Sequence, residues 1–428
     1  MRLFRVIGCD GASWRPSFGP EDAFKGLAWS QFLDQLIIWQ THDAAEPLPA
    51  FGPEGDGDGR AEPPSLRGEP CLVVQAGNTF LVWHPQARVL INKGRYLVVD
   101  LTADERRTLQ AESESNSFGI CPLPLNQVVL ERRSVIGRGP DPLIIPLVGQ
   151  VSLGRMSQSV AALTALRTRH SIRPEFSQAA DFCRVRLATL GYAVMKQPIK
   201  VQGSTSYNVV ADKVASDAAR RLWIVCAHLD SINDAGDSGA AAPGADDNAS
   251  GVAGALEIAE ILAPLATRDD LRFVLFGGEE QGLLGSRHYV ASLSAEDRSR
   301  VAGVINMDMV ARMNTASPAV MLEGAPISSD LINELATAAA DYTSLAVQTS
   351  LNPFASDHVP FINAGIAAVL TIEGADGTNH DVHTASDTHE RLNLSLAQEI
   401  VKANLAVLAQ GLGLIAQGGA PAPDQWVP

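Results

Sequence analysis

The feature that most constrains this chain is the alternation of strand-like and helix-like segments across residues 155–412. Two helices are predicted first, at residues 157–170 and 175–190. The predicted strands are residues 192–201, 207–213, 221–227, 271–276, 301–307, 319–322 and 366–372, and the later predicted helices are residues 252–262, 283–293, 328–340 and 393–412. Such alternation is typical of an α/β fold in which a mostly parallel mixed sheet carries helices on both faces.

The first part of the chain has a different pattern. Residues 1–150 predict a smaller N-terminal accessory domain of mixed α/β type with antiparallel strands, followed by a second domain at 151–415 and a flexible tail at 416–428. The predicted elements of residues 1–150 are an amphipathic helix at 27–40, an exposed loop at 51–70, and strands at 71–75, 79–84, 95–101 and 128–131.

Composition narrows the class of protein. The chain has 33 basic and 48 acidic residues and a net charge of −15, which disfavours nucleic acid and anionic membranes as partners. No apolar run reaches the ~18 residues that a membrane span needs. The N-terminal residues lack the pattern of a signal peptide, so a cytoplasmic protein is expected if Met1 is the native start.

The five cysteines are widely spaced, which argues against a zinc site built from thiolates. Buried free thiols are the simplest interpretation. Pairing of Cys71 with Cys121 stays open at this point.

Candidate ligands follow the strands. Acidic or imidazole side chains come directly after three of the predicted strands and in the loop that follows a fourth, and a further acidic pair, Asp246-Asp247, precedes a predicted helix. Because ligands bind at the carboxyl ends of the strands in open α/β sheets, these side chains are expected at one edge. They are His228 and Asp230 after the first such strand, Glu279 and Glu280 after the second, Asp308 after the third, and His380, Asp381 and His383 after the fourth.

These residue types suit zinc, which takes imidazole nitrogen and carboxylate oxygen. Two imidazoles and three carboxylates exceed the needs of one catalytic ion, and they fit two ions about 3.5–4 Å apart that share a bridging carboxylate. Asp246 is interpreted as the hub of this metal site. In the Glu279-Glu280 pair, one side chain can bind metal while the other faces the substrate.

In these motifs the sequence resembles the zinc aminopeptidases of the M28 peptidase family. The resemblance covers residues 155–412 and leaves residues 1–150 unmatched. It rests on Ala227-His228-Leu229-Asp230-Ser231, Gly244-Ala245-Asp246-Asp247-Asn248-Ala249-Ser250-Gly251, Gly278-Glu279-Glu280-Gln281-Gly282-Leu283-Leu284-Gly285-Ser286, Asn306-Met307-Asp308-Met309, Ser356-Asp357-His358 and His383-Thr384-Ala385-Ser386-Asp387-Thr388.

The resemblance implies a two-zinc exopeptidase acting on peptide substrates. By position, His228 and Asp308 would hold one Zn²⁺, Glu280 and His383 the other, and Asp246 would bridge them. It further implies that Asp230 orients the His228 ring, that Glu279 is the general base that takes a proton from the attacking water, and that a cis peptide joins Asp246 and Asp247, with Asp247 not a ligand.

Two positions depart from the family pattern. Many relatives have a tyrosine immediately before the last histidine ligand, where this chain has Val382. His358 is therefore considered for substrate binding at the edge of the site, with a structural hydrogen bond as the alternative. His380 competes with His383 for the ligand role, and the residues after His383 favour His383.

Three other functions remain open at this point. Arg287 and Arg312 lie near the motifs and could hold a C-terminal carboxylate, as a carboxypeptidase requires. A glutaminyl cyclase-like enzyme would use one zinc, whereas all five ligand positions are filled here. A non-catalytic, receptor-like protein is the remote alternative, and the retained Glu279 argues against it.

Overall fold

A computed structural model describes residues 3–7, 27–40, 66–75, 77–113, 118–215 and 220–414. The chain divides into two units. Unit 1 comprises residues 1–134, 348–355 and 375–380, and unit 2 comprises residues 135–347, 356–374 and 381–428. The change of unit at Val135 lies before the predicted boundary at residue 150, and two short segments from the second half of the chain belong to unit 1. The predicted tail at 416–428 lies outside the described residues.

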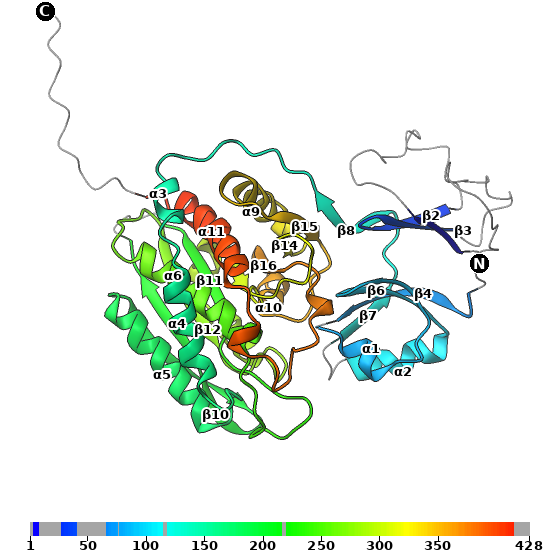
Figure 1. Ribbon diagram of the computed structural model, residues 1–428, viewed down its shortest axis with the longest axis horizontal. Coiled ribbons are helices and arrows are strands. Elements are labelled where there is room, and N and C mark those ends of the chain that lie inside the picture. Colours follow the sequence, from blue (N-terminus) through cyan, green and yellow to red (C-terminus); the bar gives the residue numbers. More distant parts are fainter. Residues whose placement is uncertain are drawn as a thin grey trace, which may run out of the picture. The chain divides into compact units, whose positions relative to one another are not determined.

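Unit 2 is built around one mixed sheet (Figure 1). Its strands are β9 (Ala193–Val201), β10 (Ser204–Lys213), β11 (Leu222–His228), β12 (Asp270–Phe276), β13 (Val301–Met307), β14 (Ala319–Glu323) and β16 (Ala368–Glu373). The order is β14-β16-β13-β11-β12-β10-β9. The four central strands are parallel, whereas β14, β10 and β9 pair antiparallel with their neighbours. Because these four strands are parallel, the carboxyl ends of β11, β12, β13 and β16 lie at one edge of the sheet.

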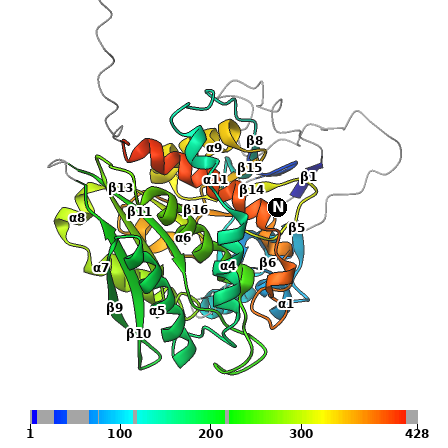
Figure 2. The same ribbon diagram turned by 60° about the vertical axis from the view of Figure 1, so that its left-hand side comes forward.

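Helices cover both faces of this sheet because the central strands are apolar on both sides. All seven residues of β11 are buried. The helices are α3 (Ile145–Val148), α4 (Leu153–Thr164), α5 (Pro174–Thr189), α6 (Gly251–Leu262), α7 (Leu284–Ser292), α8 (Ala295–Arg300), α9 (Ser329–Tyr342), α10 (His358–Asn363) and α11 (Leu394–Gly411). Helices α4, α5, α6, α9 and α11 share the larger core on one face, and α7 and α10 share a second core on the other. Figure 2 shows α6 over β11 with α4 packed beside α6.

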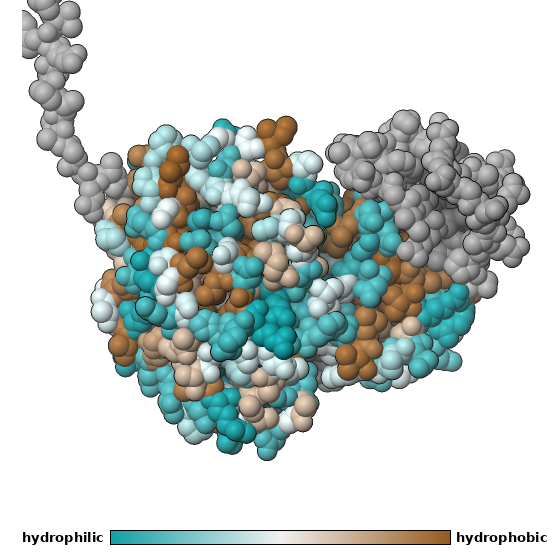
Figure 3. Space-filling view, in the orientation of Figure 1, coloured by the Kyte–Doolittle hydropathy of each residue, from teal (hydrophilic) through white to brown (hydrophobic). Residues whose placement is uncertain are grey.

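The predicted α/β class is therefore confirmed for the larger unit. Every strand and helix predicted after residue 150 is present, with ends shifted by a few residues. Hydrophilic and hydrophobic residues are interspersed on the face of unit 2 that Figure 3 shows, as on most protein surfaces. None of the helices in the described ranges is long and apolar enough to cross a bilayer.

Unit 1 contains two groups of strands and two helices. One group is ordered β1-β3-β2-β8 and the other β5-β6-β4-β7. The elements are β1 (Leu3–Ile7), β2 (Leu27–Phe32), β3 (Gln35–Gln40), β4 (Glu69–Gln75), α1 (Thr79–Trp83), β5 (Val89–Lys93), β6 (Tyr96–Leu101), α2 (Ala103–Ser113), β7 (Phe118–Pro122) and β8 (Gln127–Arg133). Strand β15 (Ala346–Ser350) carries the chain from unit 2 into unit 1.

Two predicted elements of unit 1 are wrong. Residues 27–40 form the antiparallel pair β2 and β3, not a helix. Buried residues alternate along β2 as Ala28, Ser30 and Phe32, and the polar Ser30 hid this period of two in the sequence. Leu33, with φ 54°, supplies the left-handed residue that the tight turn requires.

The segment predicted as a strand at 79–84 is instead the short helix α1. The buried side chain of Gln75 accepts a hydrogen bond from the Phe80 N–H at 2.9 Å, which satisfies one of the free amides at the start of this helix. The contact of Gln75 with Phe80 therefore favours a helix here, although the β-branched and aromatic residues of 79–84 are typical of a strand.

Cys71 and Cys121 are both free. In the register of β4 and β7, Cys71 lies opposite Pro122 and Cys121 opposite Leu72. Since adjacent residues of a strand point to opposite faces, the two thiols face opposite sides of this sheet.

Candidate metal centre

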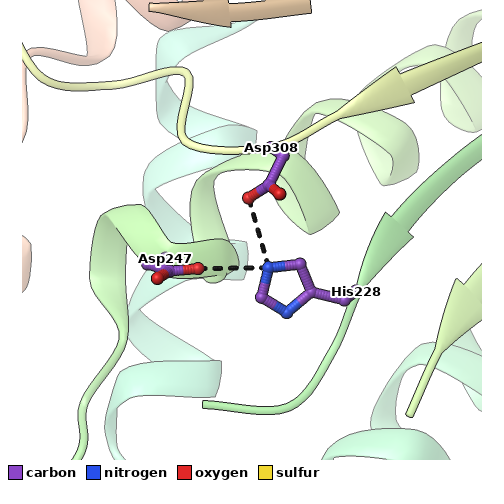
Figure 4. A group of neighbouring side chains, drawn as sticks. All are labelled: His228, Asp247 and Asp308. Atoms are coloured by element: carbon purple, nitrogen blue, oxygen red, sulfur yellow. Dashed lines mark hydrogen bonds and ion pairs between the residues drawn. The ribbon is translucent and has the colours of Figure 1, made fainter. Parts of the chain in front are cut away.

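His228, the last residue of β11, presents its ring at the sheet edge. The residue is 1% exposed. Its Nε2 atom lies 3.1 Å from Asp247 Oδ1 and 3.2 Å from Asp308 Oδ1, and Figure 4 shows the two carboxylates converging on this one nitrogen. Its Nδ1 atom faces the backbone carbonyl of Asp230 at 3.2 Å. The contact at Nδ1 thus orients the buried ring, and its Nε2 atom faces the two carboxylates.

A second group lies on the other side of Asp247. His383 Nε2 is 3.2 Å from Asp247 Oδ2 and 2.9 Å from Glu280 Oε2. The opposite ring nitrogen lies 3.2 Å from Asp234 Oδ2. His383 has a φ of 55°, an uncommon backbone conformation for a residue with a side chain. The carboxylate of Asp247 therefore spans two imidazole–carboxylate groups, with one oxygen directed to each.

This arrangement corrects the interpretation of Asp246 as the shared ligand. Asp246 turns into the protein, where its Oδ1 accepts a hydrogen bond from the Ala311 N–H at 2.9 Å and its carboxyl group hydrogen-bonds Glu373. Burial, together with the charge of Asp387, raises the pKa of Asp246 to about 8. The cis peptide is also displaced by one residue from the expected position, to Asp247–Asn248.

The pKa of Asp247 moves in the opposite direction. Burial acts to raise it, but hydrogen bonds to the rings of His228 and His383 hold the pKa well below its ordinary value. A carboxylate binds a metal ion in its ionised form, so the low pKa of Asp247 suits a metal ligand.

Asp308 follows β13, and its carboxylate is held by the hydroxyl of Ser356. The spacing of residues in the sequence did not predict this contact. Ser356 Oγ donates a hydrogen bond to Asp308 Oδ2 at 2.6 Å and accepts one from Asn306 Nδ2 at 2.8 Å. All three residues are buried. The other carboxylate oxygen of Asp308 is left directed at His228.

Two further carboxylates hold the loops in place through backbone amides. Asp230 accepts hydrogen bonds from the Glu279 and Glu280 N–H groups, both at 3.3 Å. Its carboxylate also lies 3.7 Å from His228 Nδ1, so the predicted contact with the ring is present, although the nearer oxygen is its backbone carbonyl. Asp387 accepts from the Asp246 and Asp247 N–H groups at 2.9 and 3.0 Å.

The two adjacent glutamates differ in their surroundings. Burial raises the pKa of Glu280 to about 7, against the charge of His383. Burial also raises the pKa of Glu279 well above its ordinary value; the charge of His228 opposes this, while the charges of Asp357, Glu280 and Asp308 add to it. In the described parts of the chain, Glu279 belongs to neither ligand group.

Two further predicted histidines differ in their surroundings. His358 is fully buried, with Nε2 3.3 Å from Glu323 Oε1, and its role in substrate binding stays a prediction. His380 is exposed and belongs to unit 1, whereas His383 lies in the ligand group.

Several side chains that support the site were not predicted from the sequence. Asp234 lies in the loop after β11, and no spacing in the sequence marks it. Ser231 belongs to a recognised motif, but its contacts were not predicted. Ser356 and Asp387 belong to the recognised motifs, so their presence was noted and their contacts were not. Arg169 lies outside every recognised motif and had no signal in the sequence.

The donor set fits zinc. Four nitrogen–oxygen distances in the two groups lie between 2.9 and 3.2 Å. Ligands in a tetrahedron with bonds of about 2.0 Å stand about 3.3 Å from one another. The Glu280 Oε1 atom is buried and has no hydrogen-bond partner among the described residues. An unpaired buried carboxylate oxygen beside an imidazole is expected where a cation binds.

The fold and the site together define an α/β protein with two adjacent groups of residues that could hold metal ions at the carboxyl edge of its sheet. Two curated relatives are similar to this chain. Leupeptin-inactivating enzyme 1 of Streptomyces exfoliatus is 32% identical over 251 residues, which cover 57% of this chain and 53% of the relative. Aminopeptidase YwaD of Bacillus subtilis is 32% identical over 200 residues, 46% of this chain and 42% of the relative. The chain thus spans about half the length of these relatives.

Solved structures share the fold. The zinc aminopeptidase BSAP of Bacillus subtilis has a TM-score of 0.56 at 18% identity and covers 61% of this chain and 96% of its own. The LapA aminopeptidase of Legionella pneumophila has a TM-score of 0.59 at 18% identity, with 80% and 98% covered. A glutaminyl cyclase of Porphyromonas gingivalis has a TM-score of 0.51 at 21% identity, with 61% and 99% covered.

Residues 208–408 match the description "Peptidase family M28", and the chain therefore carries a domain of this family. The resemblance stated from the motifs is confirmed over this range. The matched residues contain both ligand groups and Glu279.

Proposed function

We propose that this protein is a two-zinc aminopeptidase that hydrolyses the N-terminal peptide bond of peptides, with Glu279 as the general base. The observation that carries the proposal is the position of Asp247. Its two oxygens lie 3.1 and 3.2 Å from the Nε2 atoms of two different imidazoles. The family of the domain and the names of its relatives support the reaction class.

The residues present would hold two ions. His228 and Asp308 would bind one and His383 and Glu280 the other, with Asp247 shared between them. When bound, such a pair of ions activates water and polarises a carbonyl group. The protein contributes the buried setting, the orientation of each imidazole through its second nitrogen, and the fixed carboxylates.

Glu279 is suited to move a proton. It adjoins the ligand Glu280, and the carboxylate of Asp230 fixes the backbone amides of both residues. A raised pKa makes a carboxylate a stronger base, so Glu279 can accept a proton from water and return it to the leaving amine. Because a base must be unprotonated, activity should rise with pH through the pKa of Glu279.

The charge of the site favours the amino end of a peptide. Besides the three carboxylates that would bind the ions, Glu279, Asp230 and Asp357 lie at the site. Two bound Zn²⁺ ions would neutralise the ligand carboxylates, and the remaining acidic groups favour an α-ammonium group over a C-terminal carboxylate. Arg312, a candidate clamp for a carboxypeptidase, is occupied instead. Its guanidinium bonds Asp381 Oδ2 at 2.6 Å and the Arg391 carbonyl at 2.9 Å.

The experiment is a panel of aminoacyl chromogenic substrates with N-blocked and C-terminal controls, assayed with and without chelator. Hydrolysis of the free-amine substrates alone, lost with chelator and restored by zinc, is expected. Glu279→Gln should keep two zinc ions per chain and lower kcat by about 10²–10⁴-fold. The matched control is Glu296→Gln, at an exposed position on α8.

Three results would contradict the proposal. Wild-type kcat in Glu279→Gln would show that the base is misassigned. One zinc per chain with cyclisation of N-terminal glutamine would indicate a cyclase. Cleavage confined to substrates with a free C-terminus would indicate a carboxypeptidase.

A further inference from the structure

A short segment outside every recognised motif contacts three of the loops that carry the metal-centre residues. It comprises residues 168–171, between α4 and α5, and is called the brace segment below. Arg169, in its centre, is 0% exposed and is among the largest fully buried side chains in the described ranges. A buried guanidinium is costly unless its donors are satisfied, so its contacts indicate what it does.

The guanidinium of Arg169 joins two loops. Its Nε donates to the Leu229 carbonyl at 2.8 Å, and Leu229 lies between His228 and Asp230. Its Nη2 donates to the Gly244 carbonyl at 2.8 Å and its Nη1 to the Pro243 carbonyl, just before the loop that holds Asp247. One rigid, planar group thus fixes the distance between the His228 loop and the Asp247 loop.

Backbone contacts repeat the same connection. The Arg169 N–H donates to Ser231 Oγ at 3.1 Å, and that hydroxyl donates to the Ala242 carbonyl at 2.8 Å. Ala242 N–H in turn donates to the Arg167 carbonyl at 2.8 Å. The loop after β11 and the loop before Asp247 are therefore both held against the brace segment.

Ser171 extends the brace segment to a third loop. Its Oγ accepts a hydrogen bond from the Gly278 N–H at 2.6 Å. Gly278 has a φ of 68°, which favours glycine, and it directly precedes Glu279. A side chain at residue 278 would also meet Val201 at 2.8 Å, so the course of the chain into Glu279 and Glu280 is closely defined.

Arg169 also supplies positive charge beneath an acidic site. The carboxylates that act on it are Asp387, Asp230 and Asp247. The first two hold the amides of the metal-centre loops, and the third is the shared ligand. A lysine could supply the charge here, but it could not bond three carbonyls in a fixed plane.

We propose that Arg169 is a positioning residue which, with Ser171, sets the spacing of the His228, Asp247 and Glu279 loops so that both metal groups can share Asp247. The inference rests on the proposed two-metal function. It predicts that the affinity for one of the two Zn²⁺ ions depends on the planar arrangement of the N–H donors of the Arg169 guanidinium and not on its charge alone.

The test compares Arg169→Lys with the full-length wild type and with the control Arg272→Lys. Arg272 is a half-buried arginine of β12 that bonds Asp212, Tyr289 and Asp297. It lies near the amino end of the strand, away from the metal centre. Zn²⁺ binding to chelator-treated protein is measured by calorimetry, together with the visible spectrum of the Co²⁺-substituted protein, thermal unfolding, kcat and KM.

Arg169→Lys should weaken the binding of one Zn²⁺ by about 10–100-fold, as loss of an outer support typically does. It should also alter the Co²⁺ spectrum and lower kcat with little change in KM. Arg272→Lys should lower the unfolding temperature and leave both zinc affinities unchanged. Wild-type zinc affinities, Co²⁺ spectrum and kcat in folded Arg169→Lys would overturn the proposal.

Ser171→Ala keeps the test decisive if Arg169→Lys fails to fold. This variant removes only the acceptor of the Gly278 amide, and it should lower kcat and shift the Co²⁺ spectrum. Wild-type values for both would overturn the role of the brace segment. Wild-type protein that binds two zinc ions but hydrolyses no peptide would instead refute the proposed function, since the affinity comparison needs no activity.

Discussion

Asp246 and Asp247 are neighbours in the sequence but meet different surroundings, and this difference can be tested by one substitution at each position. In Asp247→Asn, the amide keeps one oxygen acceptor and places an NH₂ group, which cannot ligate a cation, where the second oxygen was. Since each carboxylate oxygen of Asp247 faces a different imidazole, one of the two metal groups loses a ligand.

The size of the effect follows from the contacts. Loss of a residue that hydrogen-bonds a metal ligand lowers metal affinity by about 10–100-fold. Loss of a ligand itself should therefore lower the affinity by more than about 100-fold. At about 1.4 kcal/mol per tenfold, this corresponds to more than about 2.8 kcal/mol of binding free energy. In Asp246→Asn, the amide oxygen still accepts from the Ala311 N–H and the NH₂ group can donate to Glu373. Its pKa of about 8 means that Asp246 is mostly protonated at neutral pH without metal, and an amide imitates that form.

The assay is zinc stoichiometry by elemental analysis and zinc affinity by calorimetry, on both variants in parallel. Asp247→Asn should retain at most one tightly bound zinc ion. Asp246→Asn should retain two and change the free energy of unfolding by less than about 1.5 kcal/mol, the scale of one hydrogen bond. Two zinc ions in Asp247→Asn together with loss of zinc in Asp246→Asn would refute the assignment of the shared ligand.

Three further results are expected. Ser356→Ala removes the hydroxyl that donates to Asp308 at 2.6 Å, so the affinity for one zinc ion should fall by about 10–100-fold in calorimetry; an unchanged affinity would show that Asp308 needs no such support. Phe361→Ala removes a fully buried ring packed against Phe276 and Tyr289 and should cost about 3–5 kcal/mol in urea unfolding, where a loss under about 1 kcal/mol would contradict the packing. Without metal, the raised pKa values of buried carboxyls such as Asp246 and Glu280, about 8 and about 7, mean that the folded state binds more protons than the unfolded state. The raised pKa of His383 acts in the same direction, so the thermal stability of the metal-free protein in chelator should fall as pH rises from about 5 to 8. Added zinc should reduce this fall, because the ligands bind zinc in their unprotonated forms. A rise in stability with pH in chelator would contradict this prediction.

The sequence alone determined the architecture of the larger unit and the position of its site. Both depend on local patterns: apolar runs define the parallel strands, and the residues that follow those runs must lie at the carboxyl edge. His228, Glu280, Asp308 and His383 were found in this way, and all four lie in the two ligand groups.

Local patterns were insufficient in unit 1. Residues 27–40 have an apolar composition that suits either a helix or a strand. The choice depends on the turn at Leu33 and on pairing of β2 with β3 and β8, which no single segment encodes. The same applies to residues 79–83, where the buried Gln75 side chain caps a helix.

Only the tertiary structure decided which aspartate lies between the two groups of possible ligands. Two adjacent acids before a helix have the same local signal. The outcome depends on partners far along the chain: Ala311 and Glu373 bind Asp246 within the protein, while Asp387 fixes both amides. Arg169 likewise has no motif, because its role depends on the carbonyls of Leu229, Pro243 and Gly244, which folding brings together. Residue type and spacing specify which chemistry is present, and long-range hydrogen bonds determine which atom of which residue performs it.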